Sequence, residues 1–144
     1  MQDTSRTTEA TFHVHEQMFK PMLALDPAAR KQGLQYQTPP EDGMILCFPF
    51  RKRQSLWMPN CDHPLEAWVM SDHGEVLEIL SLPTEPRQGP YETDWQYESR
   101  LPRHGSTHET RFMWEFASGE ARRRNISPGD WIEGPWSELK DRIR

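Results

Sequence analysis

Hydrophobic residues gather in short runs along this chain, and turn-forming residues separate the runs. Residues 43–48 form a continuous apolar run bounded by turn residues, which is typical of a buried strand. Residues 66–70 and 75–80 carry β-forming side chains on either side of Ser-Asp-His-Gly, which predicts a hairpin. Three further strands are predicted by their composition, over residues 11–15, 54–58 and 111–116. The second of these is expected to be the antiparallel neighbour of 43–48.

Two short helical segments interrupt the strands, over residues 26–33 and 118–125. In the first, Asp26 can cap free backbone amides, Pro27 fits the first turn, and Gly33 can end the helix in a left-handed conformation. The second segment is expected to form no more than a short helical turn.

The last ten residues, 135–144, are predicted to form an amphipathic C-terminal helix. Its inward positions recur at i, i+3, i+4 and i+7, namely Trp136, Leu139, Lys140 and Ile143. Such a helix is expected to cap the domain or to seat on a partner.

Regular patterning is lost over residues 81–110, where prolines and glycines recur and no period is sustained. This segment is predicted to be a long irregular loop, of the kind that is often functional or disordered. Three aromatic residues within seven positions, Tyr91, Trp95 and Tyr97, indicate that part of it is docked. Residues 1–10 are polar and are predicted to be a mobile tail.

A length of 144 residues fits one ordinary domain, here expected over residues 11–134. The period-2 segments predict a mainly β fold, an antiparallel β-sandwich or a barrel-like roll with two or three short helices. Six tryptophans supply large buried areas to its core.

The net charge of −5 disfavours nucleic acid as the main partner, because phosphate binding needs clustered lysine and arginine. Two basic triplets, 51–53 and 122–124, are interpreted as solvated surface. No apolar run reaches the length of a membrane span, and the N-terminus lacks the apolar region of a signal peptide. We therefore expect a cytoplasmic or virus-encoded protein without a membrane partner, whose Cys47 and Cys61 are unpaired.

Two histidine pairs have spacings that suit a metal ion. His13 and His15 alternate along a predicted strand, whereas His104 and His108 have a helical spacing near helix-breaking residues. Neither pair has further ligands at suitable positions, so no metal and no cofactor are expected.

The best polar cluster follows the strand 54–58. It consists of Trp57, Asn60, Asp62, His63 and Glu66. These side chains could line a pocket that contains an acid, a possible base and an amide. The alternative, which we favour, is structural: the turn is held by its own polar groups, and Glu66 receives backbone amides. No catalytic residue is identified, since no serine or cysteine has a base at motif spacing.

Short motifs occur in a fixed order between residues 22 and 134. They are Gly33-Leu34, Gly43-Met44-Ile45, Leu56-Trp57-Met58 with Asn60, Pro64-Leu65, Gly74, Trp114-Glu115, Ser118-Gly119 and Gly129-Asp130. In this order the chain resembles the domain of unknown function 192 family of uncharacterised prokaryotic and phage proteins. The resemblance implies a mostly antiparallel β fold and no settled biochemistry. Gln35 and Glu66 stand where the family usually has Met and Asp.

The absence of a catalytic motif favours a non-enzymatic binding or structural module over an enzyme. The long loop and the terminal helix are expected to contact a protein partner or a second copy, through Tyr91, Trp95, Tyr97, Trp136, Leu139 and Ile143. The alternative is a protein that binds a small molecule or carbohydrate, or an enzyme, with a pocket around Trp57, Asn60, His63 and Glu66.

Overall fold

A computed structural model describes the backbone of residues 6–7 and 10–144. Most of the predicted tail, residues 1–10, lies outside the described residues. Within it, Arg6–Thr7 form strand β1, which pairs antiparallel with β4 (Met22–Ala24).

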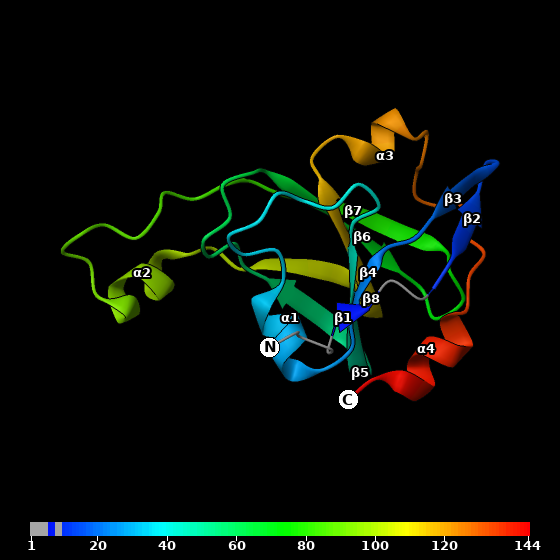
Figure 1. Cartoon of the computed structure of the whole chain (residues 1–144), viewed down its shortest axis with the longest axis horizontal. Coiled ribbons are helices and arrows are strands. Elements are labelled where there is room, and N and C mark those ends of the chain that lie inside the picture. Colours follow the sequence, from blue (N-terminus) through cyan, green and yellow to red (C-terminus); the bar gives the residue numbers. More distant parts are fainter. Residues whose placement is uncertain (1–5, 8–9) are drawn as a thin grey trace.

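The fold is mainly β, as predicted, and is built on one open six-stranded sheet with the order β1-β4-β5-β8-β6-β7 (Figure 1). Its remaining strands are β5 (Met44–Leu56), β6 (Leu65–Met70), β7 (Val76–Leu82) and β8 (His104–Ala117). Strand β4 joins β5 in parallel, and the other pairings are antiparallel. A separate hairpin consists of β2 (Phe12–Val14) and β3 (Gln17–Phe19). Within the described part of the chain, four short helices accompany the strands: α1 (Pro27–Gln32), α2 (Asp94–Arg100), α3 (Glu120–Arg123) and α4 (Trp136–Arg142).

Strand β5 corrects one prediction. Residues 54–56 do not belong to a neighbouring strand but continue the run that starts at Met44, in a single strand of 13 residues. The register against β8 shifts between Cys47 and Lys52. Pro49 therefore lies in an irregular part of the ladder, where a missing backbone N–H does not end the strand.

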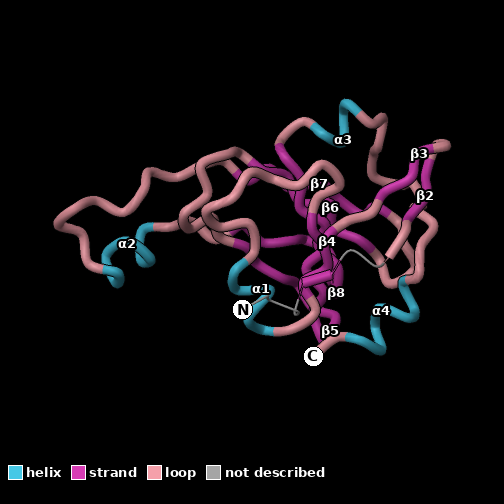
Figure 2. The backbone as a smooth tube through the Cα atoms, viewed as in Figure 1, coloured by secondary structure: helices cyan, strands magenta, loops and turns pink. Residues whose placement is uncertain are grey.

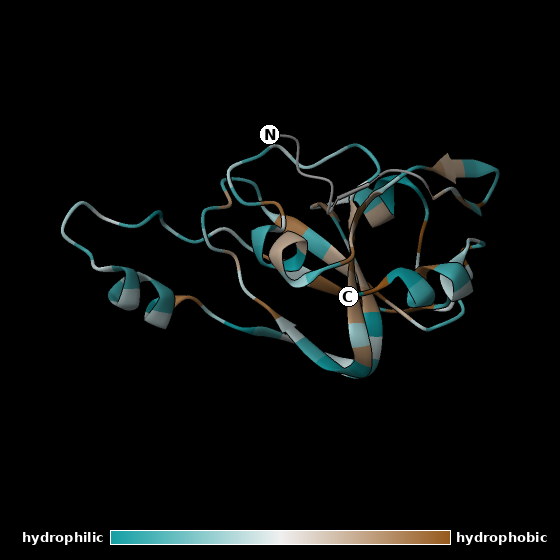
Figure 3. Cartoon of the chain, turned by 60° about the horizontal axis from the view of Figure 1, so that its bottom comes forward, coloured by the Kyte–Doolittle hydropathy of each residue, from teal (hydrophilic) through white to brown (hydrophobic). Residues whose placement is uncertain are grey.

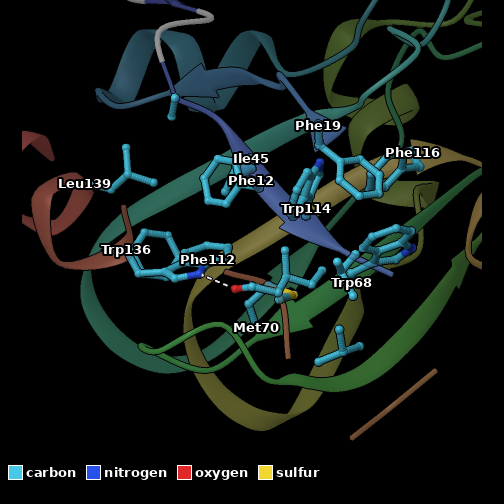
Figure 4. Packing of buried hydrophobic residues seen from close by; sticks show 14 of the residues in the cluster. Phe12, Phe19, Ile45, Trp68, Met70, Phe112, Trp114, Phe116, Trp136 and Leu139 are labelled. Carbon is cyan, nitrogen blue, oxygen red and sulfur yellow. Dashed lines mark hydrogen bonds between the residues drawn. The ribbon is translucent and has the colours of Figure 1, made fainter. Parts of the chain in front are cut away.

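One face of the sheet carries a cluster of aromatic side chains centred on Trp114 (Figure 4). Trp114 lies 5.1 Å from Phe12 and 5.4 Å from Phe19 between ring centroids, so the β2–β3 hairpin covers this face. Helix α4 closes the same cluster with Trp136 and Leu139, both buried. The amphipathic stripe of the terminal helix is therefore part of the core.

The opposite face carries a second apolar cluster around Met44, Leu46 and Met113. Helix α1 and residues 57–61 cover it. The predicted end signals of α1 are confirmed: the Asp26 carboxylate accepts a hydrogen bond from the Ala29 amide (2.8 Å), Pro27 starts the helix, and Gly33 ends it with φ +50°. The two cysteines are free and lie on different faces, Cys47 in the cluster that contains Trp114 and Cys61 in the second cluster.

Residues 83–103, here called the arm, project from one end of the sheet (Figures 1 and 2). The predicted loop 81–110 is thus too long, because β7 runs to Leu82 and β8 begins at His104. The arm also contains α2, which sequence patterning missed. A complete capping box starts this helix, in which the Thr93 side chain bonds the Gln96 amide and the Gln96 side chain bonds the Thr93 amide. Hydrophilic residues dominate the arm, whereas hydrophobic residues recur along the central strands (Figure 3).

Candidate functional site

The five residues of the predicted pocket do not converge on one site. Glu66 is buried on the Trp114 face, where its carboxylate accepts hydrogen bonds from the Trp68 indole (2.7 Å) and from the Gly119 and Ala121 amides (2.7 and 2.8 Å). This confirms the structural alternative for Glu66. Its role is to hold the start of α3 against β6.

Two others hold the base of the arm. Asp62 forms a two-point ion pair with Arg87, with distances of 2.7 and 2.6 Å from Oδ1 to Nε and from Oδ2 to Nη2. The hydrogen bond from Arg87 lowers the pKa of Asp62. The backbone N–H of Asn60 donates a hydrogen bond to the Tyr97 hydroxyl over 2.8 Å. His63 is exposed. Asp62 and Arg87 line one surface hollow and Asn60 and Tyr97 another, so the predicted residues share no single pocket.

A cavity does lie nearby, on the face of the sheet opposite Trp114, and Trp57 is the predicted pocket residue that lines it. Its volume is about 230 Å³. Its buried walls come from β5, β6, the loop after α1 and residues 57–61, namely Leu34, Leu46, Leu56, Met58, Pro59, Cys61 and Leu65. Its exposed or half-buried rim consists of Arg30, Lys31, Gln32, Gly33, Gln35, Phe48, Ser55, Trp57 and Arg103. We call this space the Glu115 cavity, after the single carboxyl found among the described residues that line it.

Glu115 lies on β8, opposite Met44 on one neighbouring strand and Ala67 on the other. Its side chain faces away from Trp114 because successive strand residues point to opposite faces. The residue is 5% exposed, and no described residue forms a hydrogen bond with its carboxyl. Burial raises the pKa of Glu115 to about 7. Its oxygens are not among the fully enclosed side-chain atoms without a partner, so they border the open space of the cavity.

The other polar groups of the cavity offer no nucleophile for covalent chemistry. Burial raises the pKa of Cys61 to about 11, with a further contribution from Glu115, and its thiol donates to the Pro59 carbonyl (3.4 Å). The thiol therefore stays protonated near neutral pH, when only a thiolate would react. Ser55 is exposed at the rim, and no histidine is among the described residues that line the cavity.

Three arginine and lysine side chains surround the mouth. Arg30 donates to the Cys47 and Arg144 carbonyls, each over 2.8 Å. The guanidinium of Arg103, at the base of the arm, stacks 4.0 Å above the centre of the Trp57 ring. Lys31 is exposed, and no described carboxylate forms an ion pair with Lys31 or Arg103.

The predicted protein interface separates into exposed and buried parts. Tyr91 and Trp95 are 96% and 76% exposed on the arm. Tyr97 is buried at the contact with Asn60, so it anchors the arm instead of a partner. Trp136 and Leu139 are core residues, and Ile143 is half-buried against the same core. Tyr97, Trp136 and Leu139 are thus buried by intramolecular contacts, and Ile143 is partly so, which leaves Tyr91 and Trp95 as the fully exposed members of the predicted interface.

The histidine pairs do not assemble into metal sites. His15 lies in the β2–β3 turn at φ +49° rather than beside His13 on a strand face, and its ring faces Asp130 at 3.4 Å. His104 and His108 lie on β8, and His108 contacts Glu78 at 2.6 Å. Among the described residues, no group of three potential metal ligands occurs. None of the helices formed by those residues is long and apolar enough to span a membrane.

Glu115 was absent from the predicted site, although the Trp114-Glu115 motif contained it. A usable signal was present: the run 112–116 is apolar on both faces, as in a strand buried on both sides, except for one acid that shares its face with Met113. Arg103 gave no comparable signal, since its stacking on Trp57 depends on the path of the arm.

Comparison with solved structures shows the same fold in two bacterial proteins. One is a candidate transcription regulator from Sinorhizobium meliloti, with 22% identity and a TM-score of 0.68 over 94% of this chain and 99% of that chain. The other is a protein of unknown function from Novosphingobium aromaticivorans, with 23% identity and a TM-score of 0.62 over 86% of this chain and 82% of that chain. These identities support likeness of fold alone.

A comparison with curated proteins gives no match. Among family models, the one described as an uncharacterized ACR, domain of unknown function 192, matches residues 9–134. That range contains strands β2 to β8 and the whole Glu115 cavity. The chain therefore belongs to the domain of unknown function 192 family.

Proposed function

We propose that this protein binds a small molecule in the Glu115 cavity. The observation that carries the proposal is the buried Glu115 carboxyl, which has no hydrogen-bond partner among the described residues and lines a cavity with apolar walls. A ligand that enters can hydrogen-bond this carboxyl, and such a bond contributes about 0.5–1.5 kcal/mol net in a typical protein. Ligand sites typically combine apolar walls with a few polar groups and a carboxyl of perturbed pKa.

The cavity supports binding more than covalent catalysis. Its thiol is held protonated, and its serine has no base among the described lining residues. At about 230 Å³ it is smaller than most drug-sized pockets, which start at ~300 Å³. The ligand is therefore a compact molecule, smaller than an oligosaccharide.

The proposed binding function can be tested with a variant in which the mouth of the Glu115 cavity is blocked. Ser55 is exposed at the rim on β5, so Ser55→Trp should fill the entrance without disturbing the core. Ser81→Trp is the matched control, since Ser81 is an exposed strand serine on β7 that does not line the cavity. A fragment library screened by NMR should give shifts at Leu46, Cys61 and Leu65 in the wild type and in Ser81→Trp. These shifts should vanish in Ser55→Trp.

The function is wrong if no fragment perturbs those residues in the wild type. It is equally wrong if the same shifts persist in Ser55→Trp, since the ligand would then enter elsewhere.

A second candidate function, contact with a protein, is supported by the arm. Polar contacts order the arm: Arg100 forms an ion pair with Glu92 at 2.7 Å, and hydrogen bonds from Asn60 and to Asp62 hold its base. It nevertheless exposes two large aromatic side chains, Tyr91 and Trp95, of the type that dominates interface hot spots. The net charge of −5 continues to favour a protein with a basic surface over nucleic acid.

The arm is tested by Tyr91→Ala combined with Trp95→Ala. Both residues are exposed, so the melting temperature should stay within about 2 °C of the wild type. Self-association measured by sedimentation equilibrium, or co-purification of a partner from the native cell, should be lost. Phe50→Ala is the control, because Phe50 is 73% exposed but lies outside the arm. Assembly that survives the double change, or that Phe50→Ala also abolishes, would exclude the arm as the interface.

A further inference from the structure

The mouth and the floor of the Glu115 cavity differ in charge. Lys31 and Arg103 are exposed at the rim without an ion pair to a described carboxylate, and Arg30 lies half-buried beside them. Glu115 is the only acid among the described residues that line the cavity. A molecule that approaches therefore meets three positive charges first, which attract anions and repel cations.

The floor of the cavity, where Glu115 lies, favours neutral groups over ions. Desolvation is the cause that shifts the pKa of Glu115 to about 7, and none of the cations at the mouth contributes to that shift. At neutral pH the protonated carboxyl thus forms at almost no cost, and it offers one O–H donor and one carbonyl acceptor. A neutral partner with the complementary pair of groups avoids the cost of burying an ion in an apolar site.

We infer that the ligand is a small organic anion with a neutral hydrogen-bonding group at its far end, such as a carboxylic acid that carries an amide. This inference rests on the proposed function. The neutral group pairs with the protonated Glu115 carboxyl on the floor, and the anionic group lies at the mouth between Lys31 and Arg103. Apolar walls from Leu46, Met58 and Leu65 enclose the carbon skeleton between the two ends.

Arg103 suits the anionic end for two reasons. Its guanidinium can bind a carboxylate through two parallel N–H donors. Stacking on Trp57 at 4.0 Å also fixes its plane, so less conformational freedom is lost when the anion binds. Arg30 is less available, because two backbone carbonyls already accept its hydrogen bonds.

The opposite assignment, an amine that pairs with an ionised Glu115, has an opposite pH dependence. The titratable groups that face Glu115 are Arg30 and Lys31 from α1, Cys61 from residues 57–61 and Arg103 before β8. Lysine and arginine stay charged between pH 6 and 8, and the Cys61 thiol stays protonated there. Only Glu115 therefore changes charge inside the cavity over this range.

Three probes with a five-carbon chain distinguish the ligand classes: glutaramate (amide and carboxylate), pentanamide (amide alone) and pentylammonium (cation). Affinity is measured by NMR titration of residues 46, 61 and 65 at pH 6 and pH 8. Glutaramate should bind tightest of the three, and about tenfold more tightly at pH 6 than at pH 8, because that is the change in the protonated fraction of a carboxyl with a pKa near 7.

Variants assign the two ends of the ligand. Glu115→Gln mimics the protonated acid, so glutaramate should bind it at both pH values as it binds the wild type at pH 6. Glu115→Leu should lose binding. Arg103→Gln should weaken glutaramate at least fivefold and leave pentanamide unchanged.

The inference is overturned if pentylammonium binds best, if affinity rises with pH, or if Glu115→Gln abolishes glutaramate binding. Any of these outcomes, with fragment binding still blocked by Ser55→Trp, leaves the cavity as a binding site and rejects only the ligand class. If no library fragment binds the wild-type cavity, the proposed function fails and the inference fails with it.

Discussion

Two glutamates on adjacent strands show what a single residue can reveal. Glu66 pairs in register with Phe116, and Glu115 pairs with Ala67, so the two acids are close in the sheet but lie on opposite faces. Glu66 accepts three hydrogen bonds and is fully accounted for by the fold. Glu115 accepts none from a described residue. A buried acid that lines a cavity and has no intramolecular partner is therefore a candidate functional group.

Glu115 should make the protein less stable as pH rises. Its folded pKa of about 7 lies above the ordinary glutamate value of 4.5, so the folded state holds the proton more tightly than the unfolded chain does. The penalty is absent below pH 4.5, grows as pH rises, and is complete above about pH 7. Relative to Glu115→Gln, which does not titrate, the wild type should lose about 3 kcal/mol of unfolding free energy over this range.

Urea denaturation at pH 4.5, 6 and 8 measures this difference. Burial alone would raise the pKa of Glu78, but hydrogen bonds from His108 and Thr107 outweigh burial and lower it to about 2, so Glu78 titrates below the window. Glu66→Gln serves as the control and should destabilise the protein at pH 8, since it weakens bonds to two backbone amides. Parallel stability curves for the wild type and Glu115→Gln would contradict the raised pKa.

At the scale of elements, two turn glycines with similar backbone conformations should differ in tolerance. Gly74 ends the β6–β7 turn at φ +99°, where an added Cβ would collide with the Ile132 carbonyl and meet the Trp136 indole at 2.5 Å. Gly129 has φ +100°, but no atom lies within 4 Å of such a Cβ.

Gly74→Ala should therefore cost more than Gly129→Ala, because both substitutions strain the backbone by about 1–3 kcal/mol and only the first also displaces α4. Thermal denaturation followed by near-ultraviolet circular dichroism would report both the stability and the Trp136 environment. Equal melting temperatures for the two variants would show that the contact between the turn and α4 is loose.

Elements were predictable from sequence where local chemistry decides them. The Asp26 cap and the Gly74 turn act within a few residues, so α1 and the β6–β7 hairpin were predicted. Strand β5 was divided in the prediction, because local preference cannot show that β8 accommodates Pro49 through a register shift. Helix α2 was missed although its capping box is local, since the surrounding prolines and glycines obscured its short pattern.

Whole-molecule contacts account for the rest of the errors. The stripe of α4 was recognised, but only tertiary packing determines that Trp136 covers Phe12 at 4.8 Å rather than a partner. The predicted pocket failed for the same reason: Asp62 and Glu66 are four residues apart in sequence, yet one holds the arm and the other holds α3. Which side chains meet in space is decided by the fold. The motif around Glu115 could therefore point to the residue, but it could not show that a cavity lies beside it.

One residue, Arg103, belongs to both candidate binding sites. Arg103 belongs to the arm and also lines the mouth of the Glu115 cavity, where it stacks on Trp57. The arm and the cavity thus share a structural boundary, although each is tested by its own variants. The domain of unknown function 192 fold here combines an aromatic core on one face with a partly open cavity on the other.

The most direct test of this account is the titration of the Glu115 carboxyl itself. The carboxyl carbon can be followed by ¹³C NMR in protein labelled at glutamate, and its signal assigned from its loss in Glu115→Gln. The midpoint should lie close to pH 7, as expected for an unpaired carboxyl in an apolar cavity. A midpoint near pH 4.5 would mean that the group is solvated or hydrogen-bonded, and would contradict its role as the polar floor of a binding site.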